Sequence, residues 1–211
     1  MSKPLFVTFE GPDGSGKTTA LNGLVKYLQK NRNDIDFIFT REPGGSQNPA
    51  AEKIRKIILD KNNIIDDKSE ALLYASARRL HLEQTVWPAL KENKIVLCDR
   101  YIDSSLAYQG EGRGLGIEFV KELNNLATDS TWPNLTIFFD ITPEAAMERA
   151  ADRAPQDRLE LAGARFHKKV YEGYKKVISS SPERFRVIDA TKSREEVLED
   201  VITIIKEEVL I

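Results

Sequence analysis

Residues 11–19 read GPDGSGKTT, and this stretch decides the fold class. It fits the pattern Gly-x-x-x-x-Gly-Lys-Thr of phosphate-binding loops. Glycines let backbone N–H groups curl around phosphate oxygens, and a helix starting near Lys17 points its positive end at the same anion. Lys17 is expected to bridge the outer phosphates, and the Thr18 hydroxyl to coordinate magnesium. The residues predicted to bind the nucleoside triphosphate here are Gly11, Pro12, Asp13, Gly14, Ser15, Gly16, Lys17, Thr18 and Thr19.

Apolar runs and amphipathic segments alternate on either side of this loop. Short apolar runs predict buried strands at 5–10, 36–40, 94–98, 135–140 and 184–189. Helical periodicity predicts helices at 17–31, 51–59, 69–91, 117–127, 143–151, 161–178 and 194–209, with Pro88 kinking the third or starting a separate last turn. The alternation predicts an α/β fold with a five-stranded parallel sheet and helices on both faces, and the loop sequence makes it a P-loop fold. Ligands then bind beyond the carboxyl ends of the strands.

Bulk composition limits the domain count and the partners. The chain has 211 residues, of which 41% are hydrophobic, so we expect a single domain over 1–211 with a substantial core. The formal net charge is −2, which gives no basic excess of the kind that marks nucleic-acid binding. The sequence shows neither a signal peptide nor a membrane span, and its single cysteine, Cys98, cannot form an internal disulfide. We therefore expect a cytoplasmic protein without nucleic-acid or membrane partners.

The loop by itself does not distinguish kinases from GTPases or other ATPases. A regulatory GTPase needs a guanine-reading Asn-Lys-x-Asp, and this tetrapeptide is absent from the sequence. The chain is also short for an oligomeric motor module. A small kinase remains the favoured class, and a P-loop ATPase that switches a partner is the alternative from a different class.

Residues after the third strand and on the long helix are candidates for holding the acceptor. Asp99 can bind magnesium or the water around it, and Arg100 can donate two parallel hydrogen bonds to a phosphate. Both residues would also suit a surface ion pair. Tyr74 and Arg78 are four residues apart and share a helix face, where they could stack on a base and bond its edge. On spacing alone, ordinary helix surface explains that pair better, and His81 is expected at the surface or packed against a partner.

A third candidate lies between two predicted helices, at 149–158. Arg149, Arg153 and Arg158 flank a proline-containing break in this segment. Loops of this kind can close over a triphosphate and supply cations to the transition state. A solvated, charged linker explains the spacing equally well.

Taken together, the motifs make the chain resemble the thymidylate kinase family over essentially its whole length. They are FEGPDGSGKTT at 9–19, TREPGG at 40–45, DRYIDSSLAYQG at 99–110 and DRLE at 157–160. The resemblance implies transfer of the γ-phosphoryl group of ATP to dTMP, giving dTDP and ADP, with Mg²⁺ as cofactor. It also implies a homodimer that packs through long helices. The nearest rival is a kinase for another nucleotide or a deoxynucleoside.

The resemblance also implies roles for individual residues on the acceptor side. Asp13 matches the carboxylate that positions the acceptor through its 3′-hydroxyl, and Arg100 the clamp on the acceptor phosphate. Tyr74 matches the ring that stacks on thymine, and Arg78 the arginine that bonds its exocyclic oxygen. The residues implied to bind dTMP are Asp13, Pro43, Tyr74, Arg78, Arg100, Ser104, Ser105, Tyr108 and Gln109, with Tyr108 crowding the 2′ position of the sugar.

One departure within the loop bears on where the catalytic cations come from. Some members of the family carry an arginine in the loop, at the position that Gly14 occupies here. The sequence instead resembles the subtype whose lid, about 149–160, supplies this cation, and Arg153 and Arg158 are the candidates. Arg149 matches the residue that stacks on adenine. The residues expected to take part in catalysis are Asp13, Lys17, Arg100, Arg153 and Arg158, with Thr18 and Asp99 holding the metal, the latter directly or through water.

Overall fold

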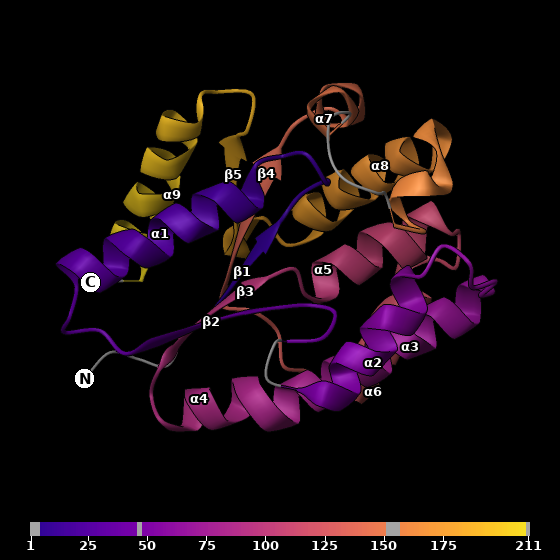
Figure 1. The fold of residues 1–211 in the computed structure, drawn as a ribbon, viewed down its shortest axis with the longest axis horizontal. Coiled ribbons are helices and arrows are strands. Elements are labelled where there is room, and N and C mark those ends of the chain that lie inside the picture. Colours follow the sequence, from indigo (N-terminus) through magenta and orange to yellow (C-terminus); the bar gives the residue numbers. More distant parts are fainter. Residues whose placement is uncertain (1–4, 46–47, 151–156, 210–211) are drawn as a thin grey trace.

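A parallel β-sheet forms the centre of the molecule in the computed structural model, which describes residues 5–45, 48–150 and 157–209 (Figure 1). The five strands, in the spatial order β2-β3-β1-β4-β5, are all parallel to their neighbours. They span Phe6–Glu10 (β1), Phe37–Arg41 (β2), Ile95–Asp99 (β3), Leu135–Asp140 (β4) and Phe185–Asp189 (β5). The predicted strands and the parallel sheet are confirmed, with bounds that differ by no more than one residue.

Helices cover both faces of this sheet because side chains alternate along each strand. Phe6, Val96 and Cys98 point into one core, which α2–α6 and α8 cover, whereas Val7 and Leu97 point into the other, beneath α1 and α9. The helices span Lys17–Asn31 (α1), Pro49–Leu59 (α2), Asp67–His81 (α3), Trp87–Lys91 (α4), Ile102–Ser105 (α5), Ile117–Thr128 (α6), Pro143–Ala150 (α7), Ala164–Ser180 (α8) and Arg194–Glu208 (α9). None of the described helices is long and apolar enough to cross a membrane.

The long helix predicted over 69–91 is divided into three parts. A π-helical segment, η1 (Leu82–Val86), separates α3 from α4, and Pro88 lies in the first turn of α4. The backbone stays helical across this junction, where the Trp87 N–H donates to the Leu82 carbonyl. Pro88, which has no N–H to donate, therefore lies where the hydrogen-bond pattern of the helix changes, close to the division predicted there.

The stretch after β3 is helical, which its glycine-rich sequence does not indicate. The short α5 runs into a second π-helical segment, η2 (Leu106–Gly112). Its backbone lies so close to α8 that a Cβ on Gly173 would fall 3.0 Å from the Cα of Ala107, and one on Gly112 would fall 2.8 Å from the Phe166 ring. Packing against α8 thus holds a helix that local propensity disfavours.

Candidate active site

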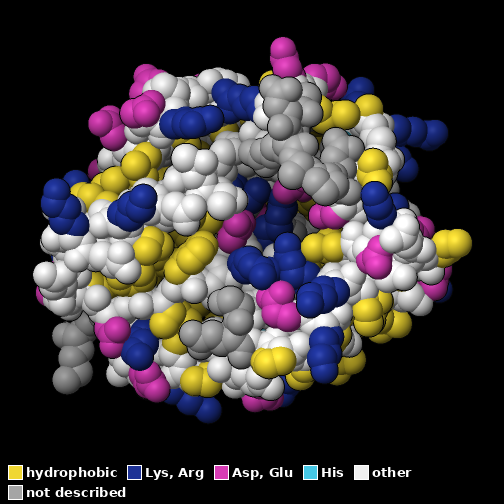
Figure 2. All heavy atoms as spheres, in the orientation of Figure 1, with side chains coloured by type: hydrophobic (Ala, Val, Ile, Leu, Met, Phe, Trp, Pro, Cys, Tyr) yellow, Lys and Arg dark blue, Asp and Glu magenta, His cyan; other side chains and the backbone are white. Residues whose placement is uncertain are grey.

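A cavity of about 310 Å³ opens where β1, β2 and β3 end. Figure 2 shows basic and acidic side chains gathered in a central hollow of this face. Adjacent carboxyl ends of a parallel sheet are where such folds bind ligands. The predicted site residues that line the cavity are Asp13, Lys17, Thr18, Pro43, Tyr74, Arg78, Asp99, Arg100, Ser104, Ser105, Tyr108 and Gln109.

The phosphate loop joins β1 to α1, as its pattern predicts. Gly14 and Gly16 have φ values of 91° and 87°, a left-handed region that glycine adopts without strain. The Lys17 ammonium is buried and donates to the carbonyls of Gly11 (3.0 Å) and Pro12 (3.3 Å). Burial, with the nearby Arg100 charge, lowers the pKa of Lys17 to about 8. The loop therefore holds a cation against backbone carbonyls at the mouth of the cavity.

The donor groups beside Lys17 suit a divalent cation. Asp99 Oδ1 is buried and has no hydrogen-bond partner in the described part of the chain. The exposed Thr18 side chain lines the same cavity. A carboxylate oxygen and a hydroxyl are hard ligands of the kind that Mg²⁺ prefers. These two residues fit the metal that their sequence positions predict.

Arg100 connects the phosphate loop to the rest of the cavity. Its Nη2 donates to Asp13 Oδ1 at 2.8 Å, and its guanidinium lies 5.3 Å from the centre of the Tyr108 ring. Burial would raise the pKa of Asp13, but the charges of Arg100 and Lys17 outweigh it and lower that pKa to about 2. The carboxylate therefore stays ionised beside the arginine at neutral pH.

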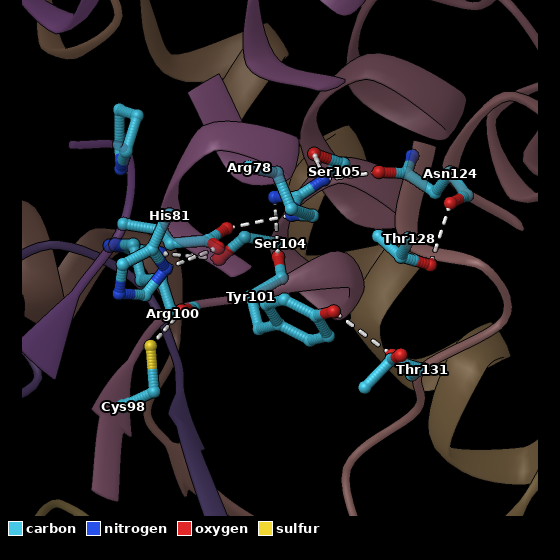
Figure 3. Close-up of polar contacts among 12 residues, drawn as sticks. Arg78, His81, Cys98, Arg100, Tyr101, Ser104, Ser105, Asn124, Thr128 and Thr131 are labelled. Carbon is cyan, nitrogen blue, oxygen red and sulfur yellow. Dashed lines mark hydrogen bonds and ion pairs between the residues drawn. The ribbon is translucent and has the colours of Figure 1, made fainter. Parts of the chain in front are cut away.

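Arg78 is buried, and each nitrogen of its guanidinium donates to a neighbouring group (Figure 3). Its Nε donates to Glu42 Oε2 at 2.7 Å, and its Nη2 donates to the Tyr101 carbonyl at 3.1 Å. Its Nη1 donates to Ser105 Oγ at 3.1 Å and also to the side-chain oxygen of Asn124. This ordered guanidinium lines the cavity, so the Tyr74–Arg78 pair is a buried part of the site rather than helix surface.

His81 contradicts the expectation that it lies at the surface. Its side chain is completely buried, with Nδ1 2.9 Å from Glu42 Oε1 and Nε2 2.7 Å from Thr40 Oγ1. Burial would raise the pKa of Glu42, but Arg78 and His81 hold it below its ordinary value. The reason for the error is that α3 packs its C-terminal turn against the end of β2, which helix periodicity alone does not indicate.

Gln109 reaches the cavity from η2 and is held by a buried carboxylate on α3. Its Nε2 donates to Glu70 Oε1 at 2.8 Å, and Arg113 Nη2 donates to the other oxygen of Glu70 at 2.9 Å. The nearby Tyr108 hydroxyl is buried with no hydrogen-bond partner in the described residues. Burial also raises the pKa of Tyr108, which stays a neutral phenol.

Two of the three predicted lid arginines lie away from the cavity lining, and the third is not described. Arg149 donates to the carbonyls of Ala190 (2.6 Å) and Thr191 (3.0 Å). Arg158 donates to Glu70 Oε2 at 2.5 Å and to the Ile58 carbonyl at 2.9 Å. Arg153 lies outside the described residues. In this conformation Arg158 is tied to α2 and α3.

The sequence predictions assign no role to several buried polar residues that support the site, namely Glu10, Glu42, Glu70 and Asn124. Glu42 lies inside the quoted stretch TREPGG, and Glu10 directly precedes the phosphate loop, so their positions at strand ends were an available signal. Glu70 and Asn124 offer no such signal, since they lie on helix faces whose packing partners come from distant parts of the chain.

Comparison with known proteins gives a consistent result over nearly the whole chain. A family model described as thymidylate kinase matches residues 9–201. Thymidylate kinases from Bacillus velezensis and Finegoldia magna are 52% and 50% identical to it, and each match covers 96% of this chain and 95% or 98% of the relative. A crystal structure of thymidylate kinase from Ehrlichia chaffeensis superposes with a TM-score of 0.75 at 32% identity, covering 96% of this chain and 98% of that one.

Proposed function

Because this chain belongs to the thymidylate kinase family, we propose how its cavity carries out the ATP-dependent phosphorylation of dTMP to dTDP. The observation that carries the proposal is the 2.8 Å contact between Asp13 of the phosphate loop and Arg100 of the β3 end. It joins a triphosphate-binding loop to a pocket of about 310 Å³, a size suited to a small ligand. Two substrates can therefore meet at one point.

The donor half is the loop from Gly11 to Thr19. Its backbone N–H groups and the N-terminus of α1 bind the phosphates of ATP, while the Lys17 ammonium moves from loop carbonyls to phosphate oxygens. Thr18 and Asp99, the latter directly or through water, would hold Mg²⁺, which neutralises charge on the phosphates when bound. Arg149, whose guanidinium donates to the Ala190 and Thr191 carbonyls, is the residue that we propose stacks on adenine.

The acceptor half is the pocket between α3, α5 and η2. Arg100 clamps the acceptor phosphate, and Asp13 accepts a hydrogen bond from the 3′-hydroxyl of the sugar. Tyr74 stacks on the thymine ring, and Arg78 bonds an exocyclic oxygen of the base. The remaining contacts to dTMP come from Pro43, Ser104, Ser105, Gln109 and, against the 2′ position, Tyr108.

Catalysis in this proposal is positioning and charge neutralisation. The attacking oxygen belongs to the acceptor phosphate, which is ionised near neutral pH, so no strong general base is required. Lys17 and Arg100 approach the transferred group from the two halves of the site. Arg153 and Arg158, in the lid of a single domain over 1–211, are the further cations; Arg158 must leave Glu70 to act there.

We place the proposed homodimer on the outer face of α3 and α6. Leu72 and Leu126 are 54% and 80% exposed on these helices, large apolar side chains that a partner would cover. A shallow groove between the helices is lined by Leu72, Ala75, Ser76, Arg79, Leu80, Leu123, Leu126 and Ala127. The proposed compartment is the cytoplasm.

An acceptor panel tests the substrate assignment. ADP formation is measured with Mg²⁺-ATP and each of dTMP, AMP, GMP and CMP, together with an acceptor-free control for plain hydrolysis. We expect dTMP to give the highest kcat/KM and the control to give little turnover. Preference for a purine or cytidine nucleotide, or hydrolysis at the same rate without acceptor, would refute the proposal.

A further inference from the structure

Arg100 sits on a strained backbone, and something must hold it there. Its φ is 68°, in the left-handed region that is strained for a residue with a Cβ. Its own N–H donates to the Phe9 carbonyl at 3.0 Å, and its carbonyl accepts from the Cys98 thiol at 3.1 Å. Strain of this kind persists where the surroundings over-determine the conformation.

The Glu10 carboxylate holds the residues that follow Arg100. It is completely buried at the end of β1, and Oε1 accepts from the backbone N–H groups of Tyr101 (2.7 Å) and Ser104 (3.2 Å). Its Oε2 accepts from Ser104 Oγ at 2.5 Å and from the Tyr174 hydroxyl at 2.8 Å. One carboxylate thus ties the residue after Arg100 to the first turn of α5 and to α8.

The same network reaches the guanidinium of Arg100 directly. Its Nη1 donates to Ser104 Oγ at 3.2 Å and to the Tyr174 hydroxyl at 3.3 Å, while Nη2 donates to Asp13. The Tyr174 ring is buried between Phe138 and Tyr108, so its hydroxyl is fixed in place. Within the described part of the chain, two of the three polar contacts of this guanidinium are therefore made by groups that Glu10 anchors.

We propose that Glu10 and Tyr174 are positioning residues, which hold the Arg100 guanidinium in the orientation that receives the acceptor phosphate. This inference rests on the proposed role of Arg100 as the phosphate clamp. A free arginine side chain would lose rotamer entropy when the phosphate binds, and a side chain held in advance avoids that cost. The Tyr174 hydroxyl touches the arginine and acts through it.

Tyr174→Phe is the primary test because it removes one hydroxyl and keeps the ring. We expect kcat/KM for dTMP to fall about tenfold, as for a lost hydrogen bond to a charged group, with KM for ATP unchanged. Tyr171→Phe is the matched control on the same helix, since its hydroxyl donates to Asp140 at 2.8 Å and touches none of this network. It should leave both kinetic constants unchanged. Equal effects of the two variants would overturn the proposal.

A double-mutant cycle with Arg100→Ala tests the positioning role of Tyr174 separately from the proposed role of Arg100 as the phosphate clamp. If Tyr174 acts through Arg100, adding Tyr174→Phe to Arg100→Ala costs nothing further in kcat/KM for dTMP. A full additional tenfold loss would overturn the positioning role. If Arg100→Ala alone left dTMP kinetics unchanged, the clamp itself would be refuted.

Glu10→Gln, which keeps the shape but cannot accept all four hydrogen bonds, should likewise lower kcat/KM for dTMP without changing KM for ATP.

Discussion

The two halves of the active site are built in different ways. The donor half is a contiguous loop, residues 11–19, which acts through backbone N–H groups, one lysine and glycines in left-handed conformations. The acceptor half is assembled from side chains that follow β2 and β3 or lie on α3, α5 and η2, far apart in the sequence. The donor half therefore depends on backbone shape, whereas the acceptor half depends on buried charged side chains that need oppositely charged partners.

The buried pair of Glu42 and Arg78 is where we expect the largest effect. Glu42→Gln leaves the enclosed guanidinium without its counter-charge, and removing one partner of such a pair costs about 3–5 kcal/mol of unfolding free energy. Urea unfolding measures this loss, and titration should show weaker dTMP binding with ATP binding retained.

Glu52→Gln is the control for this prediction. Glu52 pairs with Arg41 at 2.9 Å, but both side chains are partly exposed, so its loss should cost no more than about 1 kcal/mol. If both variants unfolded at the same urea concentration, the acceptor half would not depend on buried charge as we argue.

The donor half should respond to backbone shape instead. Gly14→Ala would place a Cβ 2.1 Å from the Ala146 carbonyl oxygen at a φ of 91°, so both a clash and conformational strain oppose it. We expect a loss of about 2–3 kcal/mol in unfolding free energy and a raised KM for ATP.

Gly16→Ala separates these two contributions. Its φ is similar, at 87°, but a Cβ there meets nothing within 4 Å. It should cost only the strain, about 1–2 kcal/mol. Equal losses for the two variants would show that the contact with α7 contributes nothing to the donor loop.

The smallest expected effect concerns pH. The pKa of Lys17 in the free enzyme is lowered to about 8, mainly by burial, so raising the pH through 8 removes the proton that ATP binding needs. We expect kcat/KM for ATP to fall about tenfold per pH unit above this value. With ATP saturating, the bound triphosphate keeps Lys17 charged, and kcat/KM for dTMP should stay level to about pH 9. A constant kcat/KM for ATP across this range would contradict the prediction.

The difference between the donor and acceptor halves also explains how much could be predicted from the sequence. The strands and the loop followed from apolar runs and glycine spacing, because both are properties of consecutive residues. The roles of the acceptor residues came from the family resemblance, and spacing alone favoured a surface position for Tyr74 and Arg78. His81 was predicted wrongly, since its partners Thr40 and Glu42 come from β2. The support of Arg100 by Tyr174 was likewise not predictable, because α8 follows β3 by some distance in the chain.

The burial of Cys98 has a practical consequence. It is the sole thiol in the sequence, it is completely buried beneath the β3 end, and burial raises its pKa well above the ordinary value. Maleimide dyes, which react with exposed thiolates, should therefore leave the native chain unlabelled. Ile64→Cys, at a fully exposed position, would then give a protein labelled at one defined site without first removing the natural thiol.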